Sequence, residues 1–200
     1  VLIQWNIKRL LAYSSIEHVG IMAIGLGLGS EAAVFGALLH MTYHSLAKPV
    51  DLLSAGSLAQ LHSSSDFDRI GRGTFSRAPV ASALFVLAIV IITGSPPFGL
   101  FFSEMTILRA GFSGPHTTVT AVFLAALVVL FCGFMYQAGD LVLGPPRDPS
   151  DRRIPARERL DIGMATTVFV AIIAVISAFY LPPSLMALIR AATQVVWGVN

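Results

Sequence analysis

Residues 93–108, TGSPPFGLFFSEMTIL, interrupt an apolar run that extends from about residue 78 to residue 112. The interruption holds four residues that disturb helices: Gly94, Pro96, Pro97 and Gly99. Proline lacks the N–H of a helical hydrogen bond, and glycine is a poor helix former. Backbone that leaves the helical form at membrane depth is tolerated only where protein buries it or where it lines a wet cavity. The segment therefore predicts a broken membrane helix, with the carboxylate of Glu104 following the break.

Apolar residues dominate the whole chain. The sequence of 200 residues is 55% hydrophobic and 12% charged, with a mean hydropathy of +0.77. Soluble domains usually carry about 25% charged residues. We therefore predict an all-α, polytopic integral membrane protein. The chain begins at Val1 in the tail of an apolar run, so we expect it to be a segment whose upstream part is missing.

Five segments are apolar enough to cross a bilayer, which takes roughly 20 residues. They cover about residues 10–29, 32–61, 78–112, 117–143 and 160–181, and the third is the broken one. We expect residues 1–182 to form one transmembrane domain. Residues 183–200 would form a tail at the membrane interface, a position that suits Trp197.

The basic residues predict the orientation of these spans. Ten of the thirteen lie on one side: Lys8, Arg9, Arg69, Arg72, Arg77, Arg147, Arg152, Arg153, Arg157 and Arg159. The other side has only Arg109 and Arg190, while Lys48 lies inside the second span. Because positively charged loops stay in the cytoplasm, we expect the N-terminus and the loops 62–77 and 144–160 to be cytoplasmic.

The second span, ALLHMTYHSLAKPVD at 37–51, carries titratable side chains at intervals of four residues: His40, His44 and Lys48. Residues four apart share one slowly drifting stripe of a helix. A lysine at the bilayer centre costs on the order of 3 kcal/mol, so the stripe must face protein or water, and such residues mark ion paths or proton relays. One alternative is a set of hydrogen-bonded core residues. Another is a metal site at HxxxH, although the glutamate of the zinc-protease pattern is absent.

Other titratable residues accompany this stripe and the break. Asp51 follows Lys48 by three residues, so the two can pair on one helix face, unless both are solvated at the interface. Glu104 is a candidate proton acceptor, or else a carboxylate near the membrane surface. Glu17 and His18 are adjacent, about 100° apart on a helix, and are further candidates for the same path.

Cofactor and catalytic motifs do not occur in the sequence. Cys132 is the single cysteine, and we expect it to be buried and inert in its apolar run. There is no CxxC, GxGxxG or P-loop pattern, and the basic residues lack the interleaved aromatics of a nucleic-acid site. We predict a chain without a cofactor or resident metal, without a nucleophile set for hydrolysis and without a nucleic-acid partner.

Three motifs in this order resemble those of a known family: NIKRLLAYSSIEHVGI at 6–21, HMTYHSLAK at 40–48 and GSPPFGLFFSEMTILRAGF at 94–112. The family comprises the antiporter-like membrane subunits of respiratory complex I, of Mrp-type sodium/proton antiporters and of membrane-bound group 4 NiFe hydrogenases. The sequence is most similar to the hydrogenase-4 component F type, which is akin to a formate hydrogenlyase subunit. The resemblance implies two inverted helical repeats, each with one broken helix, of which this chain is the C-terminal part.

The resemblance also implies roles for individual residues. The family's central histidines and lysine correspond to His40, His44 and Lys48. Glu104 matches the terminal protonatable residue of the broken helix, and Lys8 matches the lysine of the family's D/N-I/L-K-R segment. Two positions depart from the family pattern. Asn6 replaces a frequent aspartate, and Asp51 stands where an apolar or aromatic residue is usual.

These observations predict a proton-translocating membrane subunit of a redox-driven complex, of the hydrogenase-4/formate hydrogenlyase or NADH-quinone oxidoreductase type. Protons would enter from the cytoplasm and reach Glu104 along Lys48, His44, His40 and bridging waters. We expect as partners other membrane subunits, a peripheral redox arm and the bilayer of a prokaryotic inner membrane. Three alternatives stay open: a structural anchor of the redox arm, an Mrp-type sodium/proton antiporter subunit, and a membrane enzyme that acts on a lipid.

Overall fold

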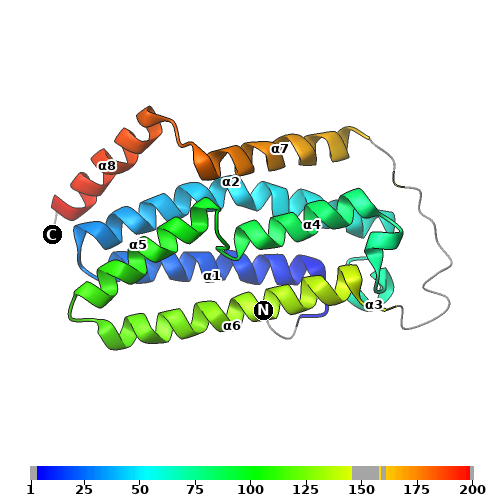
Figure 1. Ribbon diagram of the computed structural model, residues 1–200, viewed down its shortest axis with the longest axis horizontal. Coiled ribbons are helices and arrows are strands. Elements are labelled where there is room, and N and C mark those ends of the chain that lie inside the picture. Colours follow the sequence, from blue (N-terminus) through cyan, green and yellow to red (C-terminus); the bar gives the residue numbers. More distant parts are fainter. Residues whose placement is uncertain (1–3, 146–157, 159–160, 199–200) are drawn as a thin grey trace.

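The computed structural model describes residues 4–145, 158 and 161–198, which fold into a bundle of helices (Figure 1). The helices are α1 (Ile7–Gly27), α2 (Glu31–Leu61), α3 (Phe67–Ile70), α4 (Pro79–Ile92), α5 (Gly99–Ser113), α6 (Thr117–Leu143), α7 (Ile162–Phe179) and α8 (Pro183–Gly198). A 3-10 turn, Thr74–Ser76, precedes α4. The described residues contain no β-strand, so the all-α prediction is confirmed.

The central helix of the bundle is α2. It has 31 residues, which corresponds to a length of about 46 Å. It contacts α1, α4, α5, α7 and α8, and Pro49 lies inside it without ending it. Because other helices pack around α2, its titratable stripe faces neighbouring protein, and His40 is completely buried.

The break between α4 and α5 follows from its sequence. α4 ends at Ile92, and α5 begins at Gly99. Pro96 lies four residues after Ile92 and has no N–H, so the carbonyl of Ile92 lacks its helical hydrogen-bond partner. Gly94 has a φ of +67°, a left-handed conformation that glycine adopts readily. The predicted broken helix is confirmed, and its two halves meet beside α2 (Figure 1).

Asn6 determines where α1 begins. Its side-chain oxygen accepts hydrogen bonds from Lys8 N at 3.0 Å and Arg9 N at 3.3 Å, as an N-cap residue does. Its Nδ2 group donates to Asp66 Oδ1 at 2.6 Å, which ties α1 to the loop before α3. An aspartate has no N–H to donate. The second bond is therefore a physical reason for asparagine in place of aspartate.

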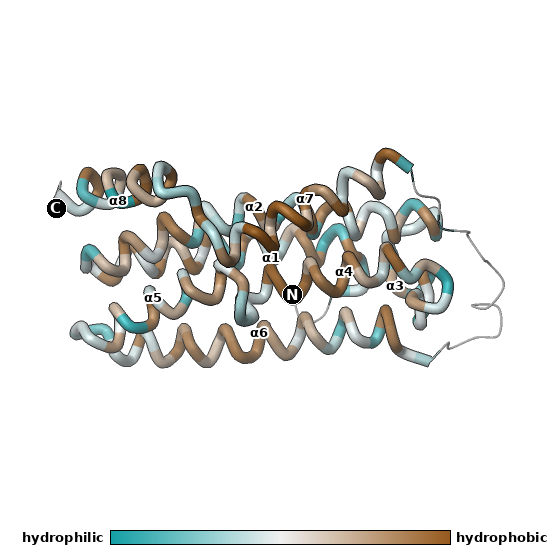
Figure 2. Tube along the Cα trace, turned by 45° about the horizontal axis from the view of Figure 1, so that its top comes forward, coloured by the Kyte–Doolittle hydropathy of each residue, from teal (hydrophilic) through white to brown (hydrophobic). Residues whose placement is uncertain are grey.

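Within the described residues, three helices are long and apolar enough to cross a membrane by themselves: α1, α6 and α7. α4 is apolar but has only 14 residues, and α2 carries the titratable stripe. Figure 2 shows mostly apolar residues along α6 and α7. The chain is therefore a multi-pass membrane protein, whereas the count of five spans stays a prediction.

The outward face of α6 is apolar. Its exposed side chains include Val119, Val122, Leu124, Val128, Val129 and Phe131. Cys132 lies exposed on the same helix, so the prediction that it is buried is wrong. Its apolar neighbours in sequence did not distinguish a core position from an outward one, because α6 is apolar on most of its circumference.

The two predicted connecting loops are described to different extents. The loop 62–77 contains α3 and the 3-10 turn, and its Arg72 forms an ion pair with Asp140 of α6 at 2.9 Å. In the loop 144–160, the five arginines lie outside the described residues. Glu158 accepts hydrogen bonds from two backbone N–H groups at the start of α4. The cytoplasmic position of both loops stays a prediction.

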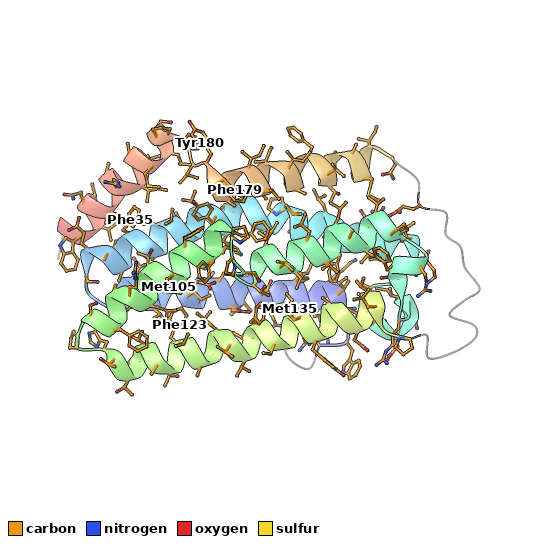
Figure 3. The ribbon with its side chains drawn as sticks, in the orientation of Figure 1. Phe35, Met105, Phe123, Met135, Phe179 and Tyr180 are labelled. Carbon is orange, nitrogen blue, oxygen red and sulfur yellow. The ribbon has the colours of Figure 1, made fainter. Side chains whose placement is uncertain are left out.

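The tail expected at the interface is the helix α8. It packs against α2, and Gln194 Nε2 donates to Glu31 Oε1 at 3.0 Å. Phe179 and Tyr180 mark the bend that separates α7 from α8 (Figure 3). The placement of α8 at a membrane interface stays a prediction.

Candidate functional site

Buried polar side chains gather where α1, α2 and α5 pack together. Six of them are less than a tenth exposed: Ser14, His18, His40, Asp51, Ser103 and Glu104. They come from three helices that lie side by side in Figure 1. Polar groups are costly to bury without partners. Their contacts therefore define the candidate site.

Lys48 uses all three of its N–H groups. Its Nζ donates to the Leu11 carbonyl at 2.8 Å, to Ser14 Oγ at 2.5 Å and to Asp51 Oδ2 at 3.0 Å. The predicted pairing of Lys48 with Asp51 on one face of α2 is thus confirmed. Asp51 Oδ1 is buried and has no hydrogen-bond partner within the described part of the chain. The lysine is held by a carboxylate on its own helix and by two oxygens of α1.

The three histidines form a second group. His18 Nδ1 lies 2.9 Å from His40 Nε2. The ring centroids of His18 and His44 are 4.5 Å apart, with the rings tilted by 39°. His18 of α1 therefore lies between two histidines of α2 that are one turn apart. The sequence marked His18 as a candidate, but the packing of α1 on α2 decides this contact.

Ser103 extends this group to α5. His40 Nδ1 lies 2.9 Å from Ser103 Oγ, and Ser103 Oγ donates to the Leu100 carbonyl at 2.7 Å. The sequence predicted no role for Ser103, because no catalytic motif surrounds it. Its position directly before Glu104 was the one available signal.

Glu104 is buried one turn into α5, with 7% of its surface exposed. A Cβ atom placed on Gly94 would overlap its carboxylate group. The backbone of Gly94, which has no side chain, therefore lies directly against this carboxylate at the helix break. His18, His40 and Glu104 each offer one nitrogen or oxygen atom, and these atoms lie within 4.8 Å of one another. One bridging water would span such a distance.

Replacing Gly94 with alanine is expected to displace the Glu104 carboxylate and to destabilise the protein. The new Cβ would occupy the carboxylate's place, and a left-handed φ costs a residue with a Cβ about 1–2 kcal/mol. The melting temperature of the full-length protein in detergent measures the effect. Gly114→Ala is the matched control, because its Cβ would meet only ordinary contacts, the nearest at 3.5 Å. Equal melting temperatures for the two variants would contradict the prediction.

Glu17 and Lys8 differ in their relation to this site. Glu17 interacts electrostatically with Lys48 and with Glu104, and its Oε2 is buried without a hydrogen-bond partner among the described residues. It thus belongs to the same interior group. Lys8 is exposed in the first turn of α1 and is not brought to the histidines. Its role in proton transfer stays a prediction.

In the part of the chain that the structure describes, the residues that lie close enough to share a metal ion are His18, His40 and Glu104. The two histidine nitrogens are hydrogen-bonded directly to each other, at 2.9 Å. That bond would have to open before both lone pairs could point at an ion. The described arrangement is that of a hydrogen-bonded histidine pair, and the expectation of no resident metal stays a prediction.

The arrangement of helices around these buried titratable residues indicates a class of protein. Apolar helices surround an interior series of basic and acidic groups that runs from Lys48 through the histidines to Glu104, beside a broken helix. Intramembrane ionisable residues in contact with one another mark ion or proton paths, and discontinuous helices commonly build ion sites in transporters. A broken helix beside buried ionisable residues is the arrangement expected of ion-translocating membrane proteins.

Comparison with known families agrees with this class. Residues 1–131 match the family described as NADH:quinone oxidoreductase/Mrp antiporter, transmembrane. The chain belongs to this family. The resemblance found in its motifs is thereby confirmed.

Individual relatives come from several kinds of complex. A hydrogenase-4 component F homolog of Methylacidiphilum infernorum is 33% identical over 145 residues, covering 72% of this chain and 30% of that protein. One subunit of a Na(+)/H(+) antiporter from Alkalihalophilus pseudofirmus is 31% identical over 129 residues, or 64% of this chain and 26% of that protein. The chain therefore spans less than a third of the length of these relatives.

Two solved structures share the fold. An archaeal membrane-bound sulfane sulfur reductase superposes with a TM-score of 0.80 at 23% identity, covering 98% of this chain and 38% of that chain. The Mrp complex from Dietzia sp. DQ12-45-1b superposes with a TM-score of 0.77 at 12% identity, covering 100% of this chain and 44% of that chain. At these identities the likeness concerns the fold alone.

Proposed function

We propose that this chain is the proton-conducting part of an antiporter-like membrane subunit in a redox-driven complex. The observation that carries the proposal is the buried group formed by the three histidines and Glu104, with the Lys48–Asp51 pair one turn further along α2. Each group in it accepts or donates a proton. A low-dielectric interior makes every one of these charges sensitive to a neighbouring charge, so a charge that moves in an adjacent subunit can drive transfer.

The proposed path begins at Lys48 and passes to His44, whose Nε2 is buried and has no hydrogen-bond partner among the described residues. It continues through His18 to His40 and Glu104. The predicted route ran directly from His44 to His40. The 4.5 Å ring contact supports the insertion of His18 between them. Glu17 is a second acceptor beside the same path.

The names of the relatives support particular partners. They include a hydrogenase-4 component, a subunit of formate hydrogenlyase and subunits of NADH-quinone oxidoreductase. We infer that other membrane subunits and a peripheral redox arm accompany the full-length protein in a prokaryotic cell membrane. Protons would enter on the side of the loops 62–77 and 144–160, which we place in the cytoplasm.

Replacing His18 with leucine in the full-length protein tests this route. Removal of a positioned proton carrier is expected to lower redox-driven proton translocation by about a hundredfold, while the complex still assembles. Acidification of inverted membrane vesicles measures the effect. His116→Leu is the control, because His116 is an exposed residue at the start of α6.

The same experiment separates the proposal from its alternatives. Normal translocation by an assembled His18→Leu complex would contradict the route and favour a structural anchor. Sodium-dependent proton exchange by the purified protein without any redox substrate would favour an Mrp-type antiporter, which the Na(+)/H(+) antiporter relatives make the second candidate.

A further inference from the structure

The hydroxyl group of Ser103 has one proton and two neighbours. One neighbour is the Leu100 carbonyl at 2.7 Å, which can only accept a hydrogen bond. The other is His40 Nδ1 at 2.9 Å. Because the single hydroxyl proton is used on Leu100, Ser103 Oγ accepts from His40. His40 therefore carries a proton on Nδ1.

The tautomer of His40 sets that of His18. A neutral imidazole has one N–H and one lone pair, so a proton on His40 Nδ1 leaves the lone pair on Nε2. That atom lies 2.9 Å from His18 Nδ1. A hydrogen bond forms only if His18 donates, so His18 also carries its proton on Nδ1.

The pair then has one nitrogen lone pair that its own hydrogen bonds do not use. With its Nδ1 proton used on His40, neutral His18 carries a bare lone pair on Nε2. His18 is thus the member of the pair that can accept one more proton without breaking a hydrogen bond.

We propose that Ser103 is a positioning residue that fixes the tautomers of His40 and His18, so that the pair takes up its next proton at His18. This deepens the proposed function and rests on it. His18 is the ring that His44 contacts, with centroids 4.5 Å apart, so the vacancy belongs to the ring next to the Lys48 end of the proposed path. The proton accepted by neutral His18 makes an imidazolium. Transfer of one proton from the pair to the Glu104 carboxylate returns both rings to the neutral state and leaves a neutral carboxylic acid.

Without the hydroxyl group, His40 Nδ1 loses its acceptor, and nothing fixes the direction of the His18–His40 hydrogen bond. His40 can then donate from Nε2 to His18 Nδ1, and the bare lone pair moves to His40 Nδ1. The expected consequence is that Nε2–H tautomers are populated and that the pair no longer takes up its next proton at His18 alone.

The test uses the full-length protein in its assembled complex, labelled with 15N-histidine. Solid-state NMR is expected to show the Nδ1–H tautomer for His18 and His40, and Nε2–H signals should appear in Ser103→Ala. Vesicle acidification by Ser103→Ala should fall by about tenfold, and Ser103→Thr should restore both measurements. Thr106→Ala is the matched control, because Thr106 also donates to a backbone carbonyl of α5, at 2.7 Å, without contacting a histidine.

Two results would overturn the proposal: unchanged Nδ1–H signals in Ser103→Ala, or acidification by that variant equal to that of Thr106→Ala. If the larger threonine does not fit at position 103, the Ser103→Ala spectrum alone still tests the proposal, because this substitution only removes an oxygen atom. Failure of the proposed function would look different. The unmodified complex would then move no protons, whatever the tautomers of its histidines.

Discussion

Replacing Glu104 with glutamine is expected to reduce proton translocation by about a hundredfold or more, the loss typical of a removed proton donor or acceptor. Glutamine matches glutamate in volume, so the contact with the backbone of Gly94 is not disturbed, but its amide cannot accept a transferred proton. Glu104 is the terminal acceptor of the proposed path, and its carboxylate lies within 4.8 Å of the histidine pair. No other carboxylate of α5 can replace it, since the helix contains only this one.

The measurement is acidification of inverted vesicles during redox turnover, together with electron transfer in the same vesicles. Glu31→Gln is the control, because Glu31 is exposed in the first turn of α2. Proton translocation at the level of the unmodified complex would show that Glu104 is not part of the path.

Replacing Lys48 with methionine is expected to destabilise the protein by about 3–5 kcal/mol, the usual cost of breaking a buried ion pair by removing one partner. Asp51 would keep its charge with its side chain completely buried. One of its two carboxylate oxygens already has no hydrogen-bond partner in the described structure. The loss should appear as a lower melting temperature of the full-length protein in detergent.

The double variant Lys48→Met with Asp51→Asn separates stability from function. Both charges are then absent, so most of the lost stability should return, because a neutral pair avoids the cost of an isolated buried charge. Proton translocation should stay low, since the lysine that starts the path is missing. Restored translocation in the double variant would mean that Lys48 only balances Asp51 and carries no protons.

The contacts of Lys48 with Asp51 and with α1 show which parts of the site could be predicted from the sequence. Its pairing with Lys48 was predictable because both residues belong to one helix, three positions apart, where helix geometry places them on the same face. The other partners of Lys48 were not predictable. Its remaining two bonds go to α1, and they depend on how closely and in what rotation α1 packs on α2.

The contacts of the histidines also divide into those that could be predicted within one helix and those that depend on packing between helices. His40 and His44 were predictable as neighbours on a stripe, whereas the insertion of His18 between them is a contact between helices. Ser103 could not be recognised at all, because its own backbone bond is ordinary and only its distance to His40 gives it a role. Lys8 matched a family motif but lies exposed and apart from the cluster.

Composition and local spacing were sufficient to predict the all-α membrane class, the broken helix at Gly94–Gly99 and the ion pair within α2, while the resemblance of three motifs indicated the family. Each of these features depends on residues that are close together in the chain or on the chain's overall make-up. Three other features could be seen only in the packed bundle. His18 lies between His40 and His44, the backbone of Gly94 lies against the carboxylate of Glu104, and Cys132 faces outward. These contacts depend on the rotation and depth of one helix against another, and that arrangement results from the packing of all the helices together.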